Sequence, residues 1–225
     1  MAISRLVATE AMENYVKAIY GLQLRGEGTP VSTNALADRL SVTPASASGM
    51  VKKLAERGLV RHVPYRGVEL SADGEALALE VLRHHRLLEL YLSESLGVPW
   101  DRVHDEAEVL EHVLSEELEE LIAAKLGDPT HDPHGDPIPT RDGQIDEGRT
   151  QPLDELDAGA RGTFVRVSDS DPGMLRWLAE RGISPGDAFE VTERQPFGGP
   201  LFVRFGGDVH VLGGGLARAM RVQAA

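Results

Sequence analysis

Residues 41–54 read S-V-T-P-A-S-A-S-G-M-V-K-K-L, and this stretch carries the clearest signal for the architecture of the first third of the chain. Thr43 and Pro44 are typical of a helix start. Proline is favoured at the first helical position because the backbone amide that it lacks would have no partner within the helix. Small side chains follow from Ala45 to Gly49, and two lysines come next. A helix with a small leading face can approach a DNA groove closely, while lysines behind it reach phosphates.

The flanking segments complete this unit. Upstream, residues 9–24 place apolar side chains at helical spacing, and residues 34–40 form a short second helix. Downstream, two β-prone runs flank P-Y-R-G at 64–67, and this pattern predicts a hairpin. A hairpin that directly follows a helix-turn-helix is a wing. A plain three-helix bundle with a hairpin is the alternative. We predict a winged helix-turn-helix DNA-binding domain over residues 1–72. Its expected DNA contacts are Thr43, Pro44, Ala45, Ser46, Gly49, Lys52, Lys53 and Arg66.

The charge distribution supports this assignment although the net charge is −13. Residues 1–70 carry nine basic and six acidic side chains, whereas residues 71–127 carry four basic and fourteen acidic ones. The basic end is therefore suited to phosphates, and the acidic middle to cations.

Composition excludes several classes of protein. The chain has no cysteine, which rules out disulfides, thiol redox chemistry and thiolate metal sites. It starts without the apolar run of a signal peptide and has no apolar stretch long enough to span a membrane. Apolar residues make up 41% of the sequence, enough for a buried core. We expect a soluble, cytoplasmic protein without a membrane partner.

The remaining two thirds fall into two parts. Residues 73–96 and 101–126 form two long helical patterns with apolar faces that should pack together or against a second subunit. We predict a helical dimerisation and metal-binding domain at 73–140 and a linker at 141–150. Over residues 151–225, short alternating runs between Gly- and Pro-rich turns predict a small β-barrel with one helix.

A histidine–carboxylate cluster lies in the acidic middle, where residues 104–112 read H-D-E-A-E-V-L-E-H. On a helix, His104, Glu108, Glu111 and His112 share a stripe about 100° wide. In the preceding helical pattern His85 and Glu89 are four residues apart and also share a face. A divalent cation offsets carboxylate repulsion and accepts imidazole nitrogen, so this pattern favours a metal site over a solvated acidic helix with incidental histidines. It is not H-E-x-x-H, so a zinc peptidase has no support.

These parts occur in a familiar order. With E-N-Y-V-K-A-I-Y (13–20), P-A-S-A-S-G-M-V-K-K-L (44–54), V-P-W-D-R-V-H-D-E-A-E (98–108) and H-G-D-P-I-P (134–139), the chain resembles the diphtheria toxin repressor family of metal-dependent transcriptional regulators, over nearly its whole length. This family has iron-dependent and manganese-dependent branches. The resemblance implies a mainly α fold with β structure: a winged helix-turn-helix, a helical dimerisation domain and a C-terminal SH3-like domain.

The resemblance also implies two metal sites. His85, Glu89 and His104 match the ancillary site, and Glu111 and His112 match the regulatory site. Glu108 stands where iron-type members have cysteine and manganese-type members glutamate, so the chain follows the manganese type. The first-helix ligand aligns with Asn14, which departs from the methionine or aspartate of the two branches, and Met12 is a nearby alternative. The SH3-like domain donates a further ligand from S-D-S-D-P (168–172), with Asp171 as first choice and Asp169 as second.

The function that follows is a metal-activated homodimer that binds double-stranded operator DNA and represses metal-uptake genes. Carboxylate and imidazole ligands favour Mn²⁺, with Fe²⁺ as the alternative or additional metal. His131 and His134, in the loop before residue 140, are interpreted as structural residues. Two other functions stay open: a winged-helix regulator controlled by an organic effector, and a metal-dependent enzyme on a DNA-binding scaffold. The enzyme lacks a visible nucleophile–base pair.

Overall fold

The computed structural model describes residues 8–26 and 28–225, which divide into two compact units. Unit one holds the described residues up to His84, together with Glu111–Leu114 and Pro139–Gln144. Unit two holds His85–Leu110, Ser115–Ile138 and Ile145–Ala225.

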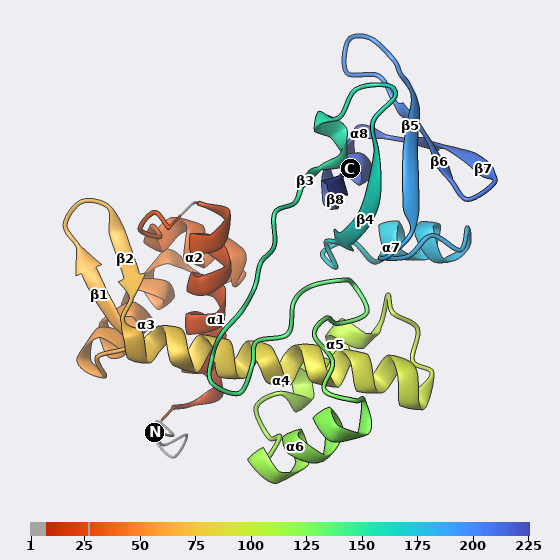
Figure 1. The fold of residues 1–225 in the computed structure, drawn as a ribbon. Helices are drawn as coiled ribbons and strands as arrows, with labels where there is room; N and C mark the ends of the chain where they lie inside the picture. The colour runs from red at the N-terminus through yellow and green to blue at the C-terminus, as the bar shows by residue number, and fades with distance from the viewer. Residues whose placement is uncertain (1–7, 27) are drawn as a thin grey trace. The chain divides into compact units, whose positions relative to one another are not determined.

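Unit one begins with the helix-turn-helix, made of α1 (Glu10–Arg25), α2 (Thr33–Arg39) and α3 (Pro44–Glu56). Each helix starts at a hydroxyl side chain that accepts a backbone amide: Thr9, Ser32 and Thr43. The wing is the antiparallel pair β1 (Val60–Val63) and β2 (Gly67–Leu70), the orange hairpin after α3 (Figure 1). The predicted winged helix-turn-helix is confirmed.

Three helices follow: α4 (Ala72–Leu96), α5 (Val103–Leu110) and α6 (Glu116–Lys125). The sequence pattern predicted one helix over 101–126, and that prediction is wrong. Ser115 caps α6 by accepting the amide of Leu118, and this local hydrogen bond separates α6 from α5. Glu111 and His112 therefore lie in a turn just after α5 and are not on a continuous helix.

The C-terminal part of unit two is a six-stranded antiparallel sheet in the order β3-β8-β4-β5-β6-β7. Its elements in chain order are β3 (Gln151–Pro152), the short 3-10 helix η1 (Leu153–Glu155), β4 (Arg161–Val167), α7 (Pro172–Ala179), β5 (Ala188–Arg194), β6 (Leu201–Phe205), β7 (Asp208–Leu212), α8 (Gly214–Ala219) and β8 (Met220–Ala224). Its core is fully buried and apolar, with Phe164, Leu178, Val191 and Met220 among its members.

No helix in the described ranges is both long enough and apolar enough to cross a membrane.

Candidate metal centre

Four of the expected ligands gather within unit two. Glu89 Oε1 lies 3.0 Å from His85 Nε2 and 3.3 Å from His104 Nδ1, and His104 Nδ1 is also 3.0 Å from Asp169 Oδ2. The potential ligand atoms of these four residues all lie within 4.8 Å of one another. Residues from α4, the start of α5 and the segment after β4 thus converge on one point, which we call the ancillary cluster.

The electrostatics of the ancillary cluster suit a cation. Burial alone would raise the pKa of Glu89, but His85, His104 and His134 outweigh it and hold that pKa well below its ordinary value. The carboxylates of Asp169 and Glu89 raise the pKa of His104 to about 10. In the metal-free protein His104 is therefore protonated at neutral pH, and a metal ligated by this ring must displace a proton.

The structure reverses the order of preference between the two candidate aspartates of S-D-S-D-P. Asp171 is the N-cap of α7, and its Oδ1 accepts the amide of Gly173 at 2.8 Å. Because Pro172 occupies the first helical position, Asp171 is the cap, and its carboxylate accepts a backbone amide that has no partner within the helix. Asp169, the second choice from sequence, is the residue that lies beside His104.

Two residues that sequence reasoning had not placed in a metal site extend the ancillary cluster. His134 and Asp132 are buried and form with Glu89 a second group of potential ligands. His134 Nδ1 lies 3.8 Å from Glu89 Oε2, while its Nε2 donates to the carbonyl of Trp100 at 2.8 Å. The Nδ1 side of the ring therefore faces Glu89, and against the effect of burial this contact helps to raise the pKa of His134 to about 9. The signal in the sequence is the D-P-H-G spacing in a loop, from which sequence analysis predicts only a structural role for His134.

Asp132 holds this loop in shape. Its Oδ1 accepts the amides of His134 at 2.8 Å and of Asp136 at 2.9 Å, and burial raises its pKa well above the ordinary value. His131, the other histidine of the loop, is exposed and lies 2.9 Å from the hydroxyl of Thr130.

Glu108 borders the ancillary cluster. Its Oε1 is 3.8 Å from His104 Nε2 and 3.9 Å from His85 Nδ1. The sequence had assigned it to the regulatory site, and that role stays a prediction.

A second cluster lies in unit one, where α1 faces the turn after α5. His112 Nδ1 lies 2.6 Å from Glu13 Oε2, and its Nε2 lies 3.0 Å from Asn14 Oδ1 and 3.4 Å from Glu111 Oε1. We call these residues, with Lys17, the regulatory cluster. Met12, the alternative to Asn14, is a buried apolar residue of α1, and the contact with His112 comes from Asn14 instead.

The hydrogen bonding of His112 indicates where a metal fits. Glu13 lies on the Nδ1 side of the ring, and the oxygens of Asn14 and Glu111 lie on the Nε2 side. A divalent ion that replaced the hydrogen on Nε2 would find one imidazole nitrogen and two oxygens close together. Sequence reasoning missed the orienting role of Glu13; the signal was an acid beside Asn14 on the buried side of α1.

The predicted DNA-binding residues are all exposed. Thr43, Pro44, Ala45, Ser46, Gly49, Lys52 and Lys53 are exposed on α3 and its cap, and Arg66 is exposed on the wing. Ala47, Val51 and Leu54 point the other way, into the core. The packing of α3 thus leaves its small leading face and its lysines able to approach a groove.

Comparison with known proteins identifies the chain. Residues 8–68 match the N-terminal DNA-binding domain of the iron-dependent repressors, and residues 71–140 match their metal-binding and dimerisation domain. Residues 151–224 match the FeoA domain. The chain belongs to the iron-dependent repressor family.

Among members of this family, the iron-dependent repressor IdeR of Mycobacterium tuberculosis is 32% identical over 95% of this chain and 97% of its own length. The diphtheria toxin repressor of Corynebacterium diphtheriae is 34% identical over 83% of this chain and 76% of its own. A solved manganese-dependent transcriptional repressor in complex with manganese superposes with a TM-score of 0.87 at 43% identity, covering 95% of this chain and all of the other.

This repressor is a metal-dependent, dimeric, DNA-binding regulator of transcription with a C-terminal SH3-like domain. The predicted family, fold class and regulatory function are confirmed. The family consists of DNA-binding repressors and not of enzymes.

Proposed function

We propose that this repressor senses manganese, with ferrous iron as a second activator, and that it acts in the cytoplasm on operators of metal-uptake genes. The observation that carries the proposal is the convergence of His112 Nε2, Asn14 Oδ1 and Glu111 Oε1 in unit one. Oxygen and imidazole ligands without any cysteine suit Mn²⁺. The 43% identity to a manganese-dependent repressor supports the same metal.

The residues of the regulatory cluster have different roles in the proposed site. Glu13 contacts Nδ1 of His112 and so fixes the ring, while Asn14 and Glu111 present oxygens to Nε2. A bound divalent ion would supply the positive charge that lets these groups stay together. Because Glu13 and Asn14 belong to α1, their attachment to the 111–112 turn restrains the first helix of the DNA-binding domain. Two reading helices in a dimer must match half-sites about one turn of DNA apart, so this restraint favours operator binding.

The dimer needs an apolar surface, and unit two offers one. Val109 on α5 and Leu118 and Leu121 on α6 are large apolar side chains with 72%, 48% and 61% exposure. Exposed apolar side chains that gather on neighbouring elements mark interaction sites, and we propose that this face meets the second subunit.

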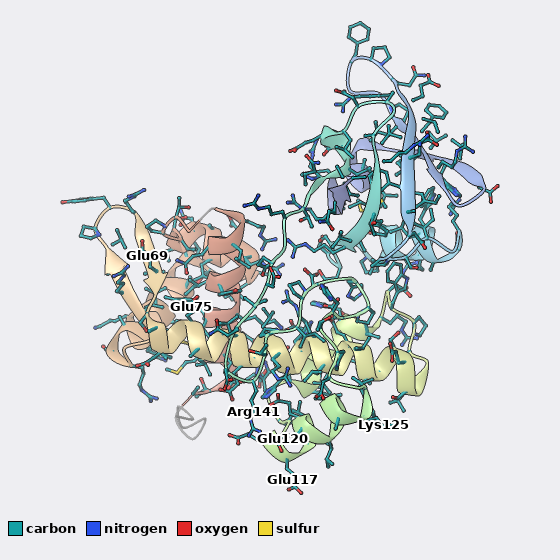
Figure 2. The ribbon with its side chains drawn as sticks, in the orientation of Figure 1. Glu69, Glu75, Glu117, Glu120, Lys125 and Arg141 are labelled. Atoms are coloured by element: carbon teal, nitrogen blue, oxygen red, sulfur yellow. The ribbon has the colours of Figure 1, made fainter. Side chains whose placement is uncertain are left out.

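Replacing Glu108 by cysteine tests the metal preference. Glu108→Cys adds a softer ligand, so we expect the operator-binding response to shift from manganese toward ferrous iron. Binding is measured anaerobically at buffered free Mn²⁺ and Fe²⁺ for the wild type and the variant, with Glu117→Cys on exposed α6 as control (Figure 2). A wild type that responds to iron alone would contradict the manganese assignment and leave metal sensing intact.

Replacing Lys52 by alanine tests the DNA-binding face. Each lysine–phosphate contact releases counterions, so Lys52→Ala should weaken binding to all sequences and reduce the log–log salt slope by about one. Lys125→Ala, which removes an exposed lysine from α6, is the matched control (Figure 2). An unchanged slope for Lys52→Ala would place this lysine away from the DNA backbone.

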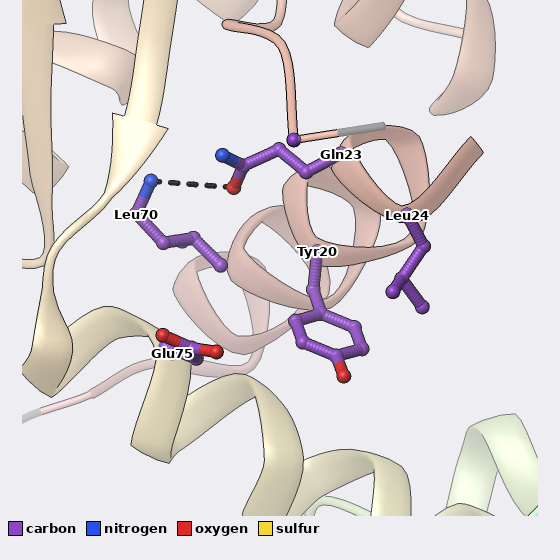
Figure 3. Close-up of a pocket in the computed structure, with 6 residues that line it drawn as sticks. Tyr20, Gln23, Leu24, Leu70 and Glu75 are labelled. Atoms are coloured by element: carbon purple, nitrogen blue, oxygen red, sulfur yellow. Dashed lines mark hydrogen bonds between the residues drawn. The ribbon is translucent and has the colours of Figure 1, made fainter. Parts of the chain in front are cut away.

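One observation supports an organic effector as second candidate. A pocket of about 380 Å³ in unit one is lined by Tyr20, Gln23, Leu24, Gly28, Leu70 and Glu75 (Figure 3). Gln23 Oε1 accepts the amide of Leu70 at 3.4 Å and joins α1 to β2 beside the pocket. If the effector lies here, filling the pocket with Leu24→Trp should change operator binding, and a chelator should not. The metal-sensor proposal expects the reverse.

A further inference from the structure

A lysine lies inside the regulatory cluster. Lys17 Nζ is 2.7 Å and 3.0 Å from the two carboxylate oxygens of Glu111. The side chain of Glu111 has 0% exposure and that of Lys17 has 16%, so the ion pair is largely removed from water. Lys17 is on α1, three residues after Asn14, and belongs with Glu111 to unit one.

A buried carboxylate needs a compensating charge, and here an ammonium group supplies it. Glu13 and Glu111 bring two negative charges to His112, and Lys17 reduces their sum to one. A divalent ion that binds Glu111 must take a carboxylate oxygen that Lys17 now holds, or share the carboxylate with it. In the first case an ion pair is lost, and in the second two cations lie close together in a medium that screens them weakly.

We propose that Lys17 is a built-in competitor of the metal at Glu111, and that it sets the free metal concentration at which the repressor becomes active. The inference rests on the proposed regulatory site at Glu111 and His112. In the metal-free protein Lys17 stabilises the regulatory cluster by offsetting its negative charge. The same charge weakens the binding of every divalent ion. A repressor that must stay inactive at low metal concentration gains a raised threshold from this arrangement.

A purely structural ion pair makes a different prediction. If Lys17 only fastens α1 to the 111–112 turn, its removal loosens the ligands and weakens metal binding. If it competes with the metal, its removal strengthens metal binding while it destabilises the metal-free form. The sign of the change in affinity therefore separates the two roles.

The test uses the full chain with His85→Ala as background, which removes one ligand of the ancillary cluster, so that Mn²⁺ binding reports mainly on the regulatory cluster. Lys17→Met removes the charge at similar length, and Lys17→Arg keeps it. By calorimetric titration with Mn²⁺, Lys17→Met should bind at least tenfold more tightly (about 1.4 kcal/mol). The midpoint of operator binding should move to lower free Mn²⁺ by the same factor, and the melting temperature should fall in the metal-free form only. Lys17→Arg should behave like the parent.

Two further variants keep the result decisive. Lys17→Gln serves if Lys17→Met does not fold, with the same expected direction. Glu111→Gln tests the proposed regulatory site itself. If this variant binds Mn²⁺ as the parent does, the regulatory site lies elsewhere and the proposed function is wrong about its location. If Glu111→Gln loses Mn²⁺ but the neutral Lys17 variants bind it equally or more weakly than the parent, the competitor role of Lys17 is overturned and the regulatory site stands.

Discussion

Glu111→Gln is expected to abolish metal-activated operator binding and to leave the dimer and the fold intact. Glutamine keeps the shape of the side chain and an oxygen that accepts from Lys17, so the partly buried ammonium retains a partner. It removes the negative charge and the stronger ligand atom beside His112 Nε2. Because loss of residues that merely support ligands typically costs 10–100-fold, we expect loss of a ligand to reduce activation by about 100-fold or more.

Operator binding across buffered free Mn²⁺ measures this effect, and sedimentation checks the dimer. Glu117→Gln, an exposed residue of α6, is the matched control and should activate normally (Figure 2). His85→Ala in the ancillary cluster should weaken activation less than Glu111→Gln does. Normal activation of Glu111→Gln at the metal occupancy of the wild type would remove this residue from the regulatory site.

Gly135→Ala is expected to destabilise unit two by about 3 kcal/mol or more, the size of effect seen when a substitution forces a backbone clash. Gly135 has a φ of +86°, and a Cβ there would lie 2.0 Å from the carbonyl oxygen of Val165. That oxygen belongs to β4, where the neighbouring Val167 amide donates to the carbonyl of His134 at 3.0 Å. Neither backbone can move without breaking the contact that holds the His134 loop on the sheet.

Gly127→Ala is the matched control, since Gly127 has a φ of +77° but a Cβ there would meet no atom within 4 Å. Its free energy of unfolding should fall only by the cost of the left-handed backbone conformation, about 1 kcal/mol. Denaturant unfolding of both variants measures the difference. Mn²⁺ binding should also weaken in Gly135→Ala, because His134 and Asp132 lose their place beside Glu89. Equal losses of stability in the two variants would show that the contact with β4 carries no weight.

Local chemistry explains which elements could be predicted well. The starts of α1, α2 and α3 depend on hydroxyl caps that bond within three residues, and such signals are visible in the sequence itself. His85 and Glu89 lie one helical turn apart, so their pairing follows from helix geometry alone. The same local rules also gave one wrong prediction. The apolar spacing across 101–126 continues past Ser115, so a single helix was predicted where the structure has two helices separated by the Ser115 cap.

The winged helix-turn-helix, the helical middle and the C-terminal strands could be predicted from the amino-acid order, and so could most of the side chains that meet in the two candidate metal clusters. Periodicity, capping and ligand chemistry are properties of neighbouring residues. Which oxygens meet which nitrogens became visible only in the folded chain. Asp169 rather than Asp171 faces His104, His134 faces Glu89, and Glu13 orients His112 from 99 residues away. Such contacts depend on how distant segments pack, and a one-residue change in a cap or turn redirects a side chain completely.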